Sequence, residues 1–144
     1  MKKETIRLGQ ISIDFLLDAT DTNGSVAILE LTIPSGERVP APHYHENFDE
    51  TIYGLEGTIT FTLEGKPVDI APGETLFIPR GVAHGFDNLK QQSAKALSVV
   101  TPALLGLDYF KEIAAIINAG GPPDVEKIKP VMIKYGLIPV KPSP

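Results

Sequence analysis

Every histidine of the chain lies in one regular arrangement with a nearby glutamate. His43 and His45 are separated by one residue, Glu50 follows five residues after His45, and His84 comes later in the chain. Three imidazole nitrogens and one carboxylate oxygen form a ligand set that suits Zn, Fe, Mn, Ni or Cu. The arrangement predicts a site for one divalent transition metal per chain and leaves the identity of the metal open.

Strand geometry decides whether these four side chains can converge. His43 and His45 are two residues apart, so on a strand both rings point to the same face. Glu50 lies an odd number of residues beyond His45, so a turn or bulge at residues 47–49 must reset the phase of the strand. His84 belongs to a later strand that a glycine-rich hairpin brings back. We expect the four ligands to meet inside a barrel.

Short strands separated by turn residues dominate the first hundred residues. The clearest alternates apolar and polar side chains, so we expect Ile59, Phe61 and Leu63 to face a core and the threonines between them to face water. The expected strands are residues 25–33, 50–55, 58–63, 68–70, 75–78, 84–88 and 95–101. Regularly spaced short strands predict an all-β, antiparallel sandwich or barrel.

After residue 102 the pattern becomes helical. Apolar residues recur at helical spacing over residues 107–117 and again over 125–135, where Asp124 is the expected N-cap. Pro130 lies inside the second pattern and should kink or split that helix. The tail after Gly136 is rich in proline, and we expect it to be loosely packed.

These patterns indicate one domain with two parts. Residues 1–101 are expected to form the β-barrel, and residues 102–144 a helical extension that packs on it. Amphipathic helices usually bury their apolar stripe, so we expect a cap on the barrel wall or over a sheet edge. A lid over the metal pocket or a dimer contact is the alternative.

Composition excludes several classes of protein. The 144 residues carry a net charge of -5 with no cluster of lysine and arginine, which argues against a nucleic-acid partner. No apolar segment has the length of a signal peptide core or of a membrane span, so we expect a cytoplasmic protein with no membrane partner. The absence of cysteine excludes thiolate ligands and thiolate nucleophiles.

Two longer motifs resemble those of the cupin superfamily. One joins His-x-His to a glutamate and a glycine, and the other runs from a glycine through Pro-x-Gly to a histidine and an asparagine. Here they comprise His43, His45, Glu50, Gly57, Gly73, Pro79, Gly81, His84 and Asn88. The departure is a turn between Gly36 and His43 that is one residue longer than in the family. The likeness covers residues 24–101, and the flanks resemble small single-domain bacterial cupins similar to quercetin dioxygenases.

The resemblance implies both a fold and a set of residue roles. The fold is an antiparallel double-stranded β-helix, or jelly-roll barrel, with a short C-terminal helical extension. His43, His45, Glu50 and His84 are implied to hold the metal, whereas the glycines, Pro79 and Asn88 of the motifs are structural. Four protein ligands in an octahedral site leave two positions for water, substrate or dioxygen. The resemblance also implies a homodimer.

A dioxygenase is the first functional hypothesis. Glu50 is the expected catalytic residue, which as a general base would loosen from the metal and take a proton from the substrate. The side chains expected to form the substrate pocket are all apolar, namely Ile52, Ile59, Phe61, Leu63 and Phe86. Such a pocket favours a small aromatic or enol-type substrate.

Two other hypotheses stay open, and the sequence does not decide whether the protein is an enzyme. The metal could serve an isomerase or a hydrolase by activating water, although sugar-phosphate isomerases need lysine or arginine inside the barrel and the inward positions carry none. The barrel could also bind a metal or a small ligand without catalysis. A thiol dioxygenase is disfavoured, because that branch of the cupins has a third histidine where Glu50 stands.

Overall fold

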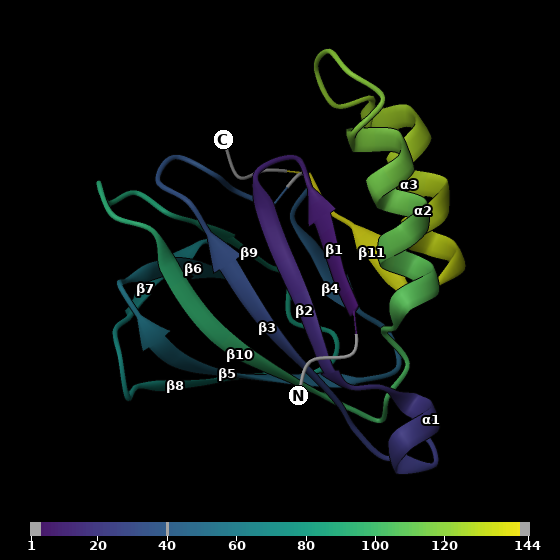
Figure 1. Ribbon diagram of the computed structural model, residues 1–144, viewed down its shortest axis with the longest axis horizontal. Helices are drawn as coiled ribbons and strands as arrows, with labels where there is room; N and C mark the ends of the chain where they lie inside the picture. Colours follow the sequence, from purple (N-terminus) through teal and green to yellow (C-terminus); the bar gives the residue numbers. More distant parts are fainter. Residues whose placement is uncertain (1–3, 40, 142–144) are drawn as a thin grey trace.

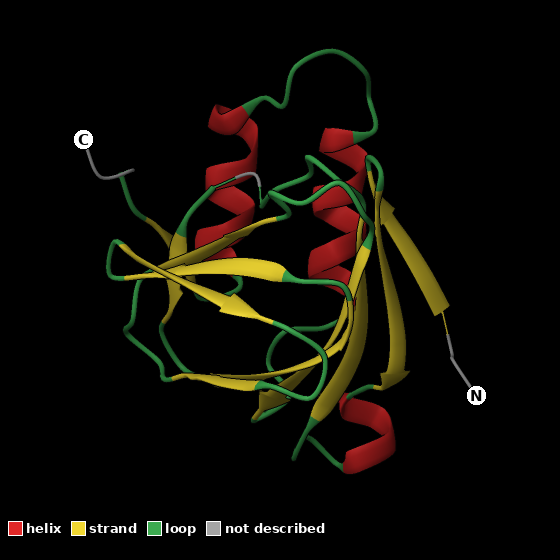
Figure 2. Ribbon diagram, turned by 90° about the vertical axis from the view of Figure 1, so that its left-hand side faces the viewer, coloured by secondary structure: helices red, strands yellow, loops and turns green. Residues whose placement is uncertain are grey.

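The protein folds into two antiparallel sheets with two helices packed against one side (Figures 1 and 2). The computed structural model describes residues 4–39 and 41–141. The strands are β1 (Glu4–Leu8), β2 (Ile11–Leu17), β3 (Ala27–Ile33), β4 (His43–His45), β5 (Asp49–Glu56), β6 (Ile59–Leu63), β7 (Lys66–Ile70), β8 (Thr75–Ile78), β9 (His84–Asp87), β10 (Ala94–Thr101) and β11 (Leu137–Pro139). The helices are α1 (Ala19–Thr22), α2 (Leu107–Ile117) and α3 (Val125–Lys134).

The order of strands in the two sheets is that of a jelly-roll barrel. One sheet runs β1-β2-β3-β10-β5-β8 and the other runs β11-β4-β9-β6-β7, and all of these pairs are antiparallel. Strands that are distant in the chain, such as β3 and β10, become hydrogen-bonded neighbours in the same sheet. The predicted all-β, antiparallel double-stranded β-helix is confirmed.

Alternation of side chains along the strands builds the core between the sheets. Every second residue of β3 is buried, from Ala27 to Ile33, and β10 shows the same alternation from Ala94 to Val100. Successive side chains of a strand point to opposite faces, so each strand gives one face to the core and one to the outside. This alternation is the pattern from which the strands are predicted.

Strand β6 departs from the simple alternation of buried and exposed side chains. In β6, Ile59 and Phe61 are buried as expected, but Thr60 is buried as well, at 5% exposure. The prediction that the threonines of this strand face water is therefore wrong for Thr60. Its hydroxyl donates a 2.6 Å hydrogen bond to the carboxylate of Asp69 on β7, which satisfies it without exposure.

The end of the chain differs most from expectation. Residues 137–139 form β11, which pairs with β4, and Leu137 is buried. The backbone N–H of Glu46 donates to the carbonyl of Gly136, and that of Val140 to the carbonyl of Pro42, which extends the pairing at both ends. The prediction of a loose tail is wrong for residues 137–140, because Pro139 lies on an edge strand, where a missing N–H leaves no bond unmade. Residues 142–144, on which the prediction also falls, lie outside the described residues.

Both predicted helices are present. α2 packs on β1, α3 packs beside β11, and the two helices contact each other (Figure 2). Asp124 occupies the N-cap position of α3, although its side chain makes no capping hydrogen bond. Pro130 lies inside α3 without splitting it, since the helix is continuous from Val125 to Lys134. None of the helices described is long and apolar enough to cross a membrane.

Two glycines with positive φ differ in their surroundings. Replacing each by alanine separates the effect of a steric clash on the free energy of unfolding from the effect of backbone strain. Gly57 has φ +64°, and a Cβ there would lie 2.6 Å from the carbonyl oxygen of Ser93, whereas Gly73 has φ +84° and open space around it. We expect Gly73→Ala to lower the free energy of unfolding by about 1–2 kcal/mol through strain alone. Gly57→Ala should lower it by more than about 3 kcal/mol, because the clash adds to the strain. Urea denaturation of the two variants tests this, and equal losses would contradict it.

Candidate metal centre

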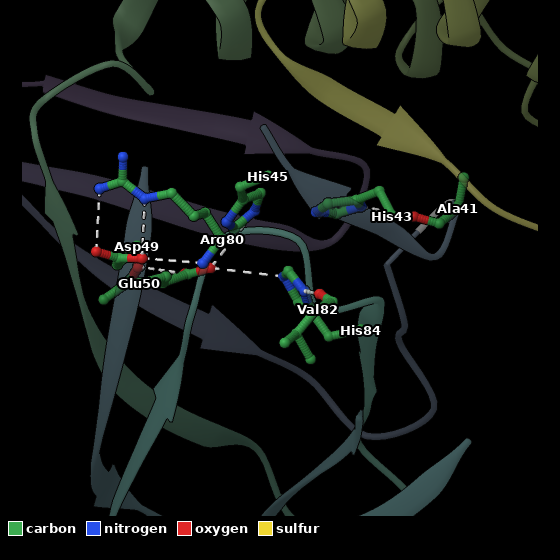
Figure 3. A network of polar contacts seen from close by, with 9 residues as sticks. Ala41, His43, His45, Asp49, Glu50, Arg80, Val82 and His84 are labelled. Atoms are coloured by element: carbon green, nitrogen blue, oxygen red, sulfur yellow. Dashed lines mark hydrogen bonds and ion pairs between the residues drawn. The ribbon is translucent and has the colours of Figure 1, made fainter. Parts of the chain in front are cut away.

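Three histidines on two paired strands form a buried cluster. His43 and His45 lie on the same face of β4, and the antiparallel register sets His43 opposite His84 of β9. One ring nitrogen from each of the three lies within 4.8 Å of the others. The side chains are 8%, 1% and 5% exposed, so the cluster is closed off from bulk solvent. The predicted convergence of these three residues is what the structure shows (Figure 3).

Backbone carbonyls orient two of the imidazole rings. The Nδ1 atom of His43 lies 2.8 Å from the carbonyl oxygen of Ala41, and Nδ1 of His84 lies 2.9 Å from that of Val82 (Figure 3). A carbonyl oxygen can only accept, so the proton of each neutral ring is on Nδ1 and the lone pair is on Nε2. This is the outer hydrogen bonding that metal-binding histidines usually have.

His45 is held by packing instead. Its ring stacks on Phe48 with 4.3 Å between the centroids, and its Nδ1 is buried with no hydrogen-bond partner in the described part of the chain. An unpaired buried polar atom is unfavourable by about 1–3 kcal/mol. A histidine at this position therefore lowers stability, which fits a role of the His45 ring in binding rather than in folding.

Burial and mutual repulsion keep His43 and His45 uncharged. Burial lowers the pKa of His43 to about 4, with a further lowering from His84. Burial lowers the pKa of His45 to about 2, and the neighbouring His84 and His43 add to the effect. Neutral imidazoles are the form that binds a metal, so these rings need no deprotonation near neutral pH.

Glu50 lies beside two of the histidines. The chain bends at Glu46 and Asn47 before β5 begins, which brings the Glu50 side chain to the same interior as His45 despite the odd spacing. Its Oε1 lies 3.8 Å from Nε2 of His45 and 3.7 Å from Nε2 of His84 (Figure 3). These separations are too long for hydrogen bonds.

The donor set fits a single cation. Two ligands that are each about 2.1 Å from one ion lie roughly 3–3.5 Å apart at octahedral or tetrahedral angles. The distances from Glu50 to His45 and His84 are only slightly larger. Neutral rings with inward lone pairs and one carboxylate oxygen are ligands suited to a divalent transition metal.

A serine that the sequence analysis missed holds the carboxylate. Ser98 on β10 is fully buried, and its hydroxyl donates a hydrogen bond to Oε2 of Glu50. The other buried side chains of this strand are Ala94, Ala96 and Val100. A single polar residue on an otherwise apolar inward face was the signal that could have identified it. The bond leaves Oε1 as the oxygen that faces the histidines.

An ion pair at the rim connects the two motifs. The Arg80 guanidinium donates to both carboxylate oxygens of Asp49, at 3.2 and 3.1 Å, and the Arg80 backbone N–H donates to it at 2.9 Å. These bonds hold the pKa of Asp49 below its usual value. The next glycine, Gly81, donates its N–H to the carbonyl of His45. The Pro-x-Gly turn is thereby tied to the strand ends that carry Glu50 and His45.

The histidines and Glu50 open on an apolar cavity of about 90 Å³. Of the predicted pocket residues, Phe61 and Phe86 line it, with ring centroids 5.9 Å apart. The other three do not: Ile52 and Ile59 are buried in the core between the sheets, and Leu63 is half-buried. The remaining walls are largely aliphatic and aromatic. No lysine or arginine of the described residues lines the cavity.

The C-terminal helices form part of this cavity. Phe110 and Ile113 of α2, and Ile128 and Met132 of α3, line it together with Leu137 of β11. The expectation of a cap on the barrel describes the packing, and the same helices also line the pocket. The alternatives of a lid and of a dimer contact stay predictions. Sequence periodicity predicted their apolar stripes without indicating that these face the metal cluster.

Comparison with known proteins identifies the family. Residues 29–100, half of the chain, match the cupin domain, and the chain belongs to this family. The match contains all three histidines, Glu50 and Ser98. It ends before α2, so the helical wall of the cavity lies outside it.

Several relatives of known name share this domain. The chain is 32% identical over 84 residues to quercetin 2,3-dioxygenase of Bacillus subtilis, an alignment that covers 58% of this chain and 24% of the relative. The chain spans between 24% and 57% of the length of the curated relatives it matches. A predicted oxalate decarboxylase from Thermotoga maritima is 25% identical with a TM-score of 0.64, covering 71% of this chain and 93% of that one. The polyketide cyclase RemF from Streptomyces resistomycificus is 28% identical with a TM-score of 0.57, covering 72% and 78%.

The lowered histidine pKa values predict how stability depends on pH. Below about pH 6.5 the unfolded chain protonates these histidines, whereas folded His43 and His45 remain neutral until about pH 4 and about pH 2. The unfolded state then binds more protons, so the free energy of unfolding of the metal-free protein should fall as pH falls. Each of the two residues contributes about 1.4 kcal/mol per pH unit.

Urea denaturation of the metal-free protein from pH 6 to pH 4.5 measures this slope. His45→Gln removes one of the titrating groups, so its slope should be smaller by about 1.4 kcal/mol per pH unit. Identical slopes for the two proteins would show that His45 is not buried and neutral in the folded state.

Proposed function

We propose that the protein is a mononuclear metal-binding cupin that acts as a dioxygenase on a small aromatic or enol-type substrate. The observation that carries this proposal is the direct opening of the three histidines and Glu50 onto an apolar cavity. The likeness to quercetin 2,3-dioxygenase supports the same class of reaction. His43, His45, His84 and Glu50 are the proposed ligands of one divalent metal per chain, which is Fe, Mn, Ni, Cu or Zn.

The chemistry of a bound redox metal would be to bind an organic substrate through oxygen and to couple it with dioxygen. The protein contributes the rest of the site. The neutral rings of His43 and His45 offer lone pairs without a loss of protons, and the closed cavity excludes bulk water from the reacting groups. The walls formed by Phe61 and Phe86 favour a flat or otherwise apolar substrate.

Glu50 is the proposed general base. Ser98 holds Oε2, so Oε1, once loosened from the metal, would be the oxygen that takes a proton from a substrate hydroxyl or from an acidic carbon. Removal of that proton gives the electron-rich enolate that reacts with dioxygen. Ser98 acts here as a positioning residue, because it touches Glu50 and not the substrate.

A metal-assisted cyclase is the second candidate. The likeness to RemF, a polyketide cyclase, favours it, since ring closure of a polyketide also begins with enolate formation. The same base and the same apolar walls would serve, but no oxygen would be consumed. A sugar-phosphate isomerase is disfavoured, because no lysine or arginine of the described residues lines the cavity. A barrel that binds metal and ligand without turnover is the outcome if neither reaction is found.

The proposed assembly is a homodimer. Tyr53 of β5 and Phe77 of β8 lie on the outer face of the six-stranded sheet, since the pairing of Thr51 with Phe77 and of Tyr53 with Thr75 sets these four side chains on one face. Tyr53 and Phe77 are 41% and 57% exposed. Exposed aromatic side chains next to each other suit a contact between two copies of the chain.

Metal binding should depend on each histidine of the cluster. His84→Ala removes one of the proposed ligands and should raise the dissociation constant for Zn by at least about a hundredfold. Tyr44→Phe is the matched control, since Tyr44 lies between His43 and His45 on β4 and is not part of the cluster. Metal content after dialysis and titration with Zn measures both variants. Full metal content in His84→Ala would contradict the assigned ligands.

Turnover should depend on Glu50 more strongly than on Ser98. Glu50→Gln keeps an oxygen ligand but removes the base, so metal content should persist while kcat falls about 10²- to 10⁴-fold. Ser98→Ala should lower kcat less, by about tenfold, because it frees the carboxylate without removing it. Oxygen uptake with the Fe-, Mn-, Ni- or Cu-loaded protein and a panel of flavonols and other enol-bearing aromatics is the measurement.

Three results decide between the candidates. Oxygen uptake that is lost in Glu50→Gln supports the dioxygenase. Conversion of an enolisable substrate without oxygen uptake supports the cyclase instead. Unchanged turnover in Glu50→Gln would remove Glu50 from the role of base.

A further inference from the structure

One polar side chain in the metal cavity is not used by the proposed mechanism. Tyr109, in the first turn of α2, lines the same cavity as the three histidines and Glu50. Apart from Tyr109, the three histidines and Glu50, the described residues that line this cavity have apolar side chains or, at Gly85, no side chain. Tyr109 is therefore the one further position from which a bound molecule could receive a side-chain hydrogen bond.

The hydroxyl of Tyr109 has no partner within the described part of the chain. The residue is 7% exposed, and no hydrogen bond of its hydroxyl is found among residues 4–39 and 41–141. Burial raises its pKa well above the usual value, so the hydroxyl is protonated near neutral pH and can donate. Tyrosines that are buried to this extent usually pair their hydroxyl with an acceptor, and Tyr109 has no such acceptor among the described residues.

The neighbouring tyrosine shows the contrast. Tyr135 lies 5.5 Å from Tyr109 between ring centroids, and its hydroxyl donates to the carboxylate of Glu112. That acceptor is also engaged by Lys134. Tyr135 does not line the cavity. Of the two tyrosines at this end of the helices, the one facing the cavity is the one whose hydroxyl is left unpaired.

The surroundings of Tyr109 are connected through the chain to the strand that carries two of the histidines. Tyr135 is followed by Gly136 and then by Leu137, which lines the cavity and pairs with His45 across the β11–β4 ladder. Tyr109 thus contacts the ring of Tyr135, and two residues after Tyr135 the chain pairs with the strand that carries His43 and His45. Figure 1 shows β11 running from the helices toward β4, consistent with this connection.

We propose that Tyr109 is a ligand-binding residue, whose hydroxyl binds the end of a ligand that lies opposite its metal-binding oxygen. The class of ligand follows from the other walls of the cavity, where side chains such as Phe110, Ile113 and Met132 offer only apolar contact. It is a molecule with an oxygen-based metal-binding group, an apolar middle and a hydroxyl, carbonyl or ether oxygen at the far end. This inference rests on the proposed function, since it takes the metal site as the anchor.

Tyr109 lies outside the part of the chain that matches the cupin domain. The match ends at residue 100, and α2 and α3 follow it. The barrel would then supply the metal and the base, whereas the helical extension would select the substrate by length and by its far polar group. Such a division assigns to the extension a role beyond covering the barrel.

Hydroxamates of different length test the proposal with the Zn-loaded protein. Acetohydroxamate has the metal-binding group alone, hexanohydroxamate adds an apolar chain, and 6-hydroxyhexanohydroxamate adds a terminal hydroxyl on a flexible chain. Calorimetry should show hexanohydroxamate binding at least about tenfold more tightly than acetohydroxamate, because its methylenes enter the apolar walls. The terminal hydroxyl should weaken binding less than about threefold in the native protein, since Tyr109 pairs with it.

Tyr109→Phe removes the hydroxyl and keeps the ring. In this variant the terminal hydroxyl of the probe should weaken binding by at least about tenfold, whereas the affinity for hexanohydroxamate should change less than about twofold. Tyr135→Phe is the matched control and should behave as the native protein with all three probes. An equal effect of the terminal hydroxyl in the native protein and in Tyr109→Phe would overturn the proposal.

Failure of the proposed function would look different. If Zn or acetohydroxamate does not bind at all, the metal-centred function is wrong and the inference falls with it. If both bind, but lengthening the probe brings no gain in affinity, the metal centre stands and the ligand-binding role of the helical wall is overturned.

Discussion

Three buried imidazoles lie within 4.8 Å of one another. Burial and repulsion between the rings lower the pKa of His43 and of His45, even though the Glu50 carboxylate lies 3.8 Å from Nε2 of His45. The folded protein tolerates this cluster only while the rings of those two residues are neutral, because burial and mutual repulsion both disfavour protonation. Neutral rings must either bond to protein groups or present free lone pairs. Two of them bond to carbonyls through Nδ1 and so direct Nε2 inward. The electrostatics of burial and the chemistry of metal binding therefore require the same protonation state.

The rest of the barrel can be understood as support for this cluster. The antiparallel register of β4 and β9 sets His43 opposite His84, and β11 holds β4 from its other side. The Pro-x-Gly turn bonds to the backbone of His45 through Gly81. Ser98 on β10 then fixes the carboxylate of Glu50 on the neighbouring strand β5. His43 and His45 lie on β4, Glu50 on β5 and His84 on β9, so misplacing any one of these three strands would displace at least one ligand.

Short motifs carried most of what the sequence could predict, because ligand spacing and turn residues are local. The spacing of His43 and His45, the phase change before Glu50 and the turn before His84 predicted the cluster, and alternation predicted the strands. Contacts between distant segments were not accessible in this way. Proline content suggested a loose tail, but Leu137 pairs with His45 because β4 has a free edge there. Thr60 is buried because Asp69 happens to lie across the hairpin, which no pattern within β6 could show.

Contacts between distant segments were even harder to predict at the site than in the fold. Ser98 and Tyr109 are distant in sequence from every motif residue, and only the folded chain brings them to the cluster or its cavity. Ile52, Ile59 and Leu63 share an inward face with Phe61 in the sequence pattern, yet the cavity is lined by Phe61 and Phe86 and by helices beyond the barrel. Strand alternation distinguishes the inside from the outside of a barrel, but it does not distinguish the core from the pocket.

The most direct test is a crystal structure of the protein loaded with one of the candidate metals, with the ion located by its anomalous scattering. The account predicts one ion per chain, about 2.0–2.2 Å from nitrogens of His43, His45 and His84 and from an oxygen of Glu50. The ion should border the cavity that Phe61, Phe86 and Tyr109 line. An ion bound elsewhere, or no ion between the three histidines at saturating metal, would contradict it.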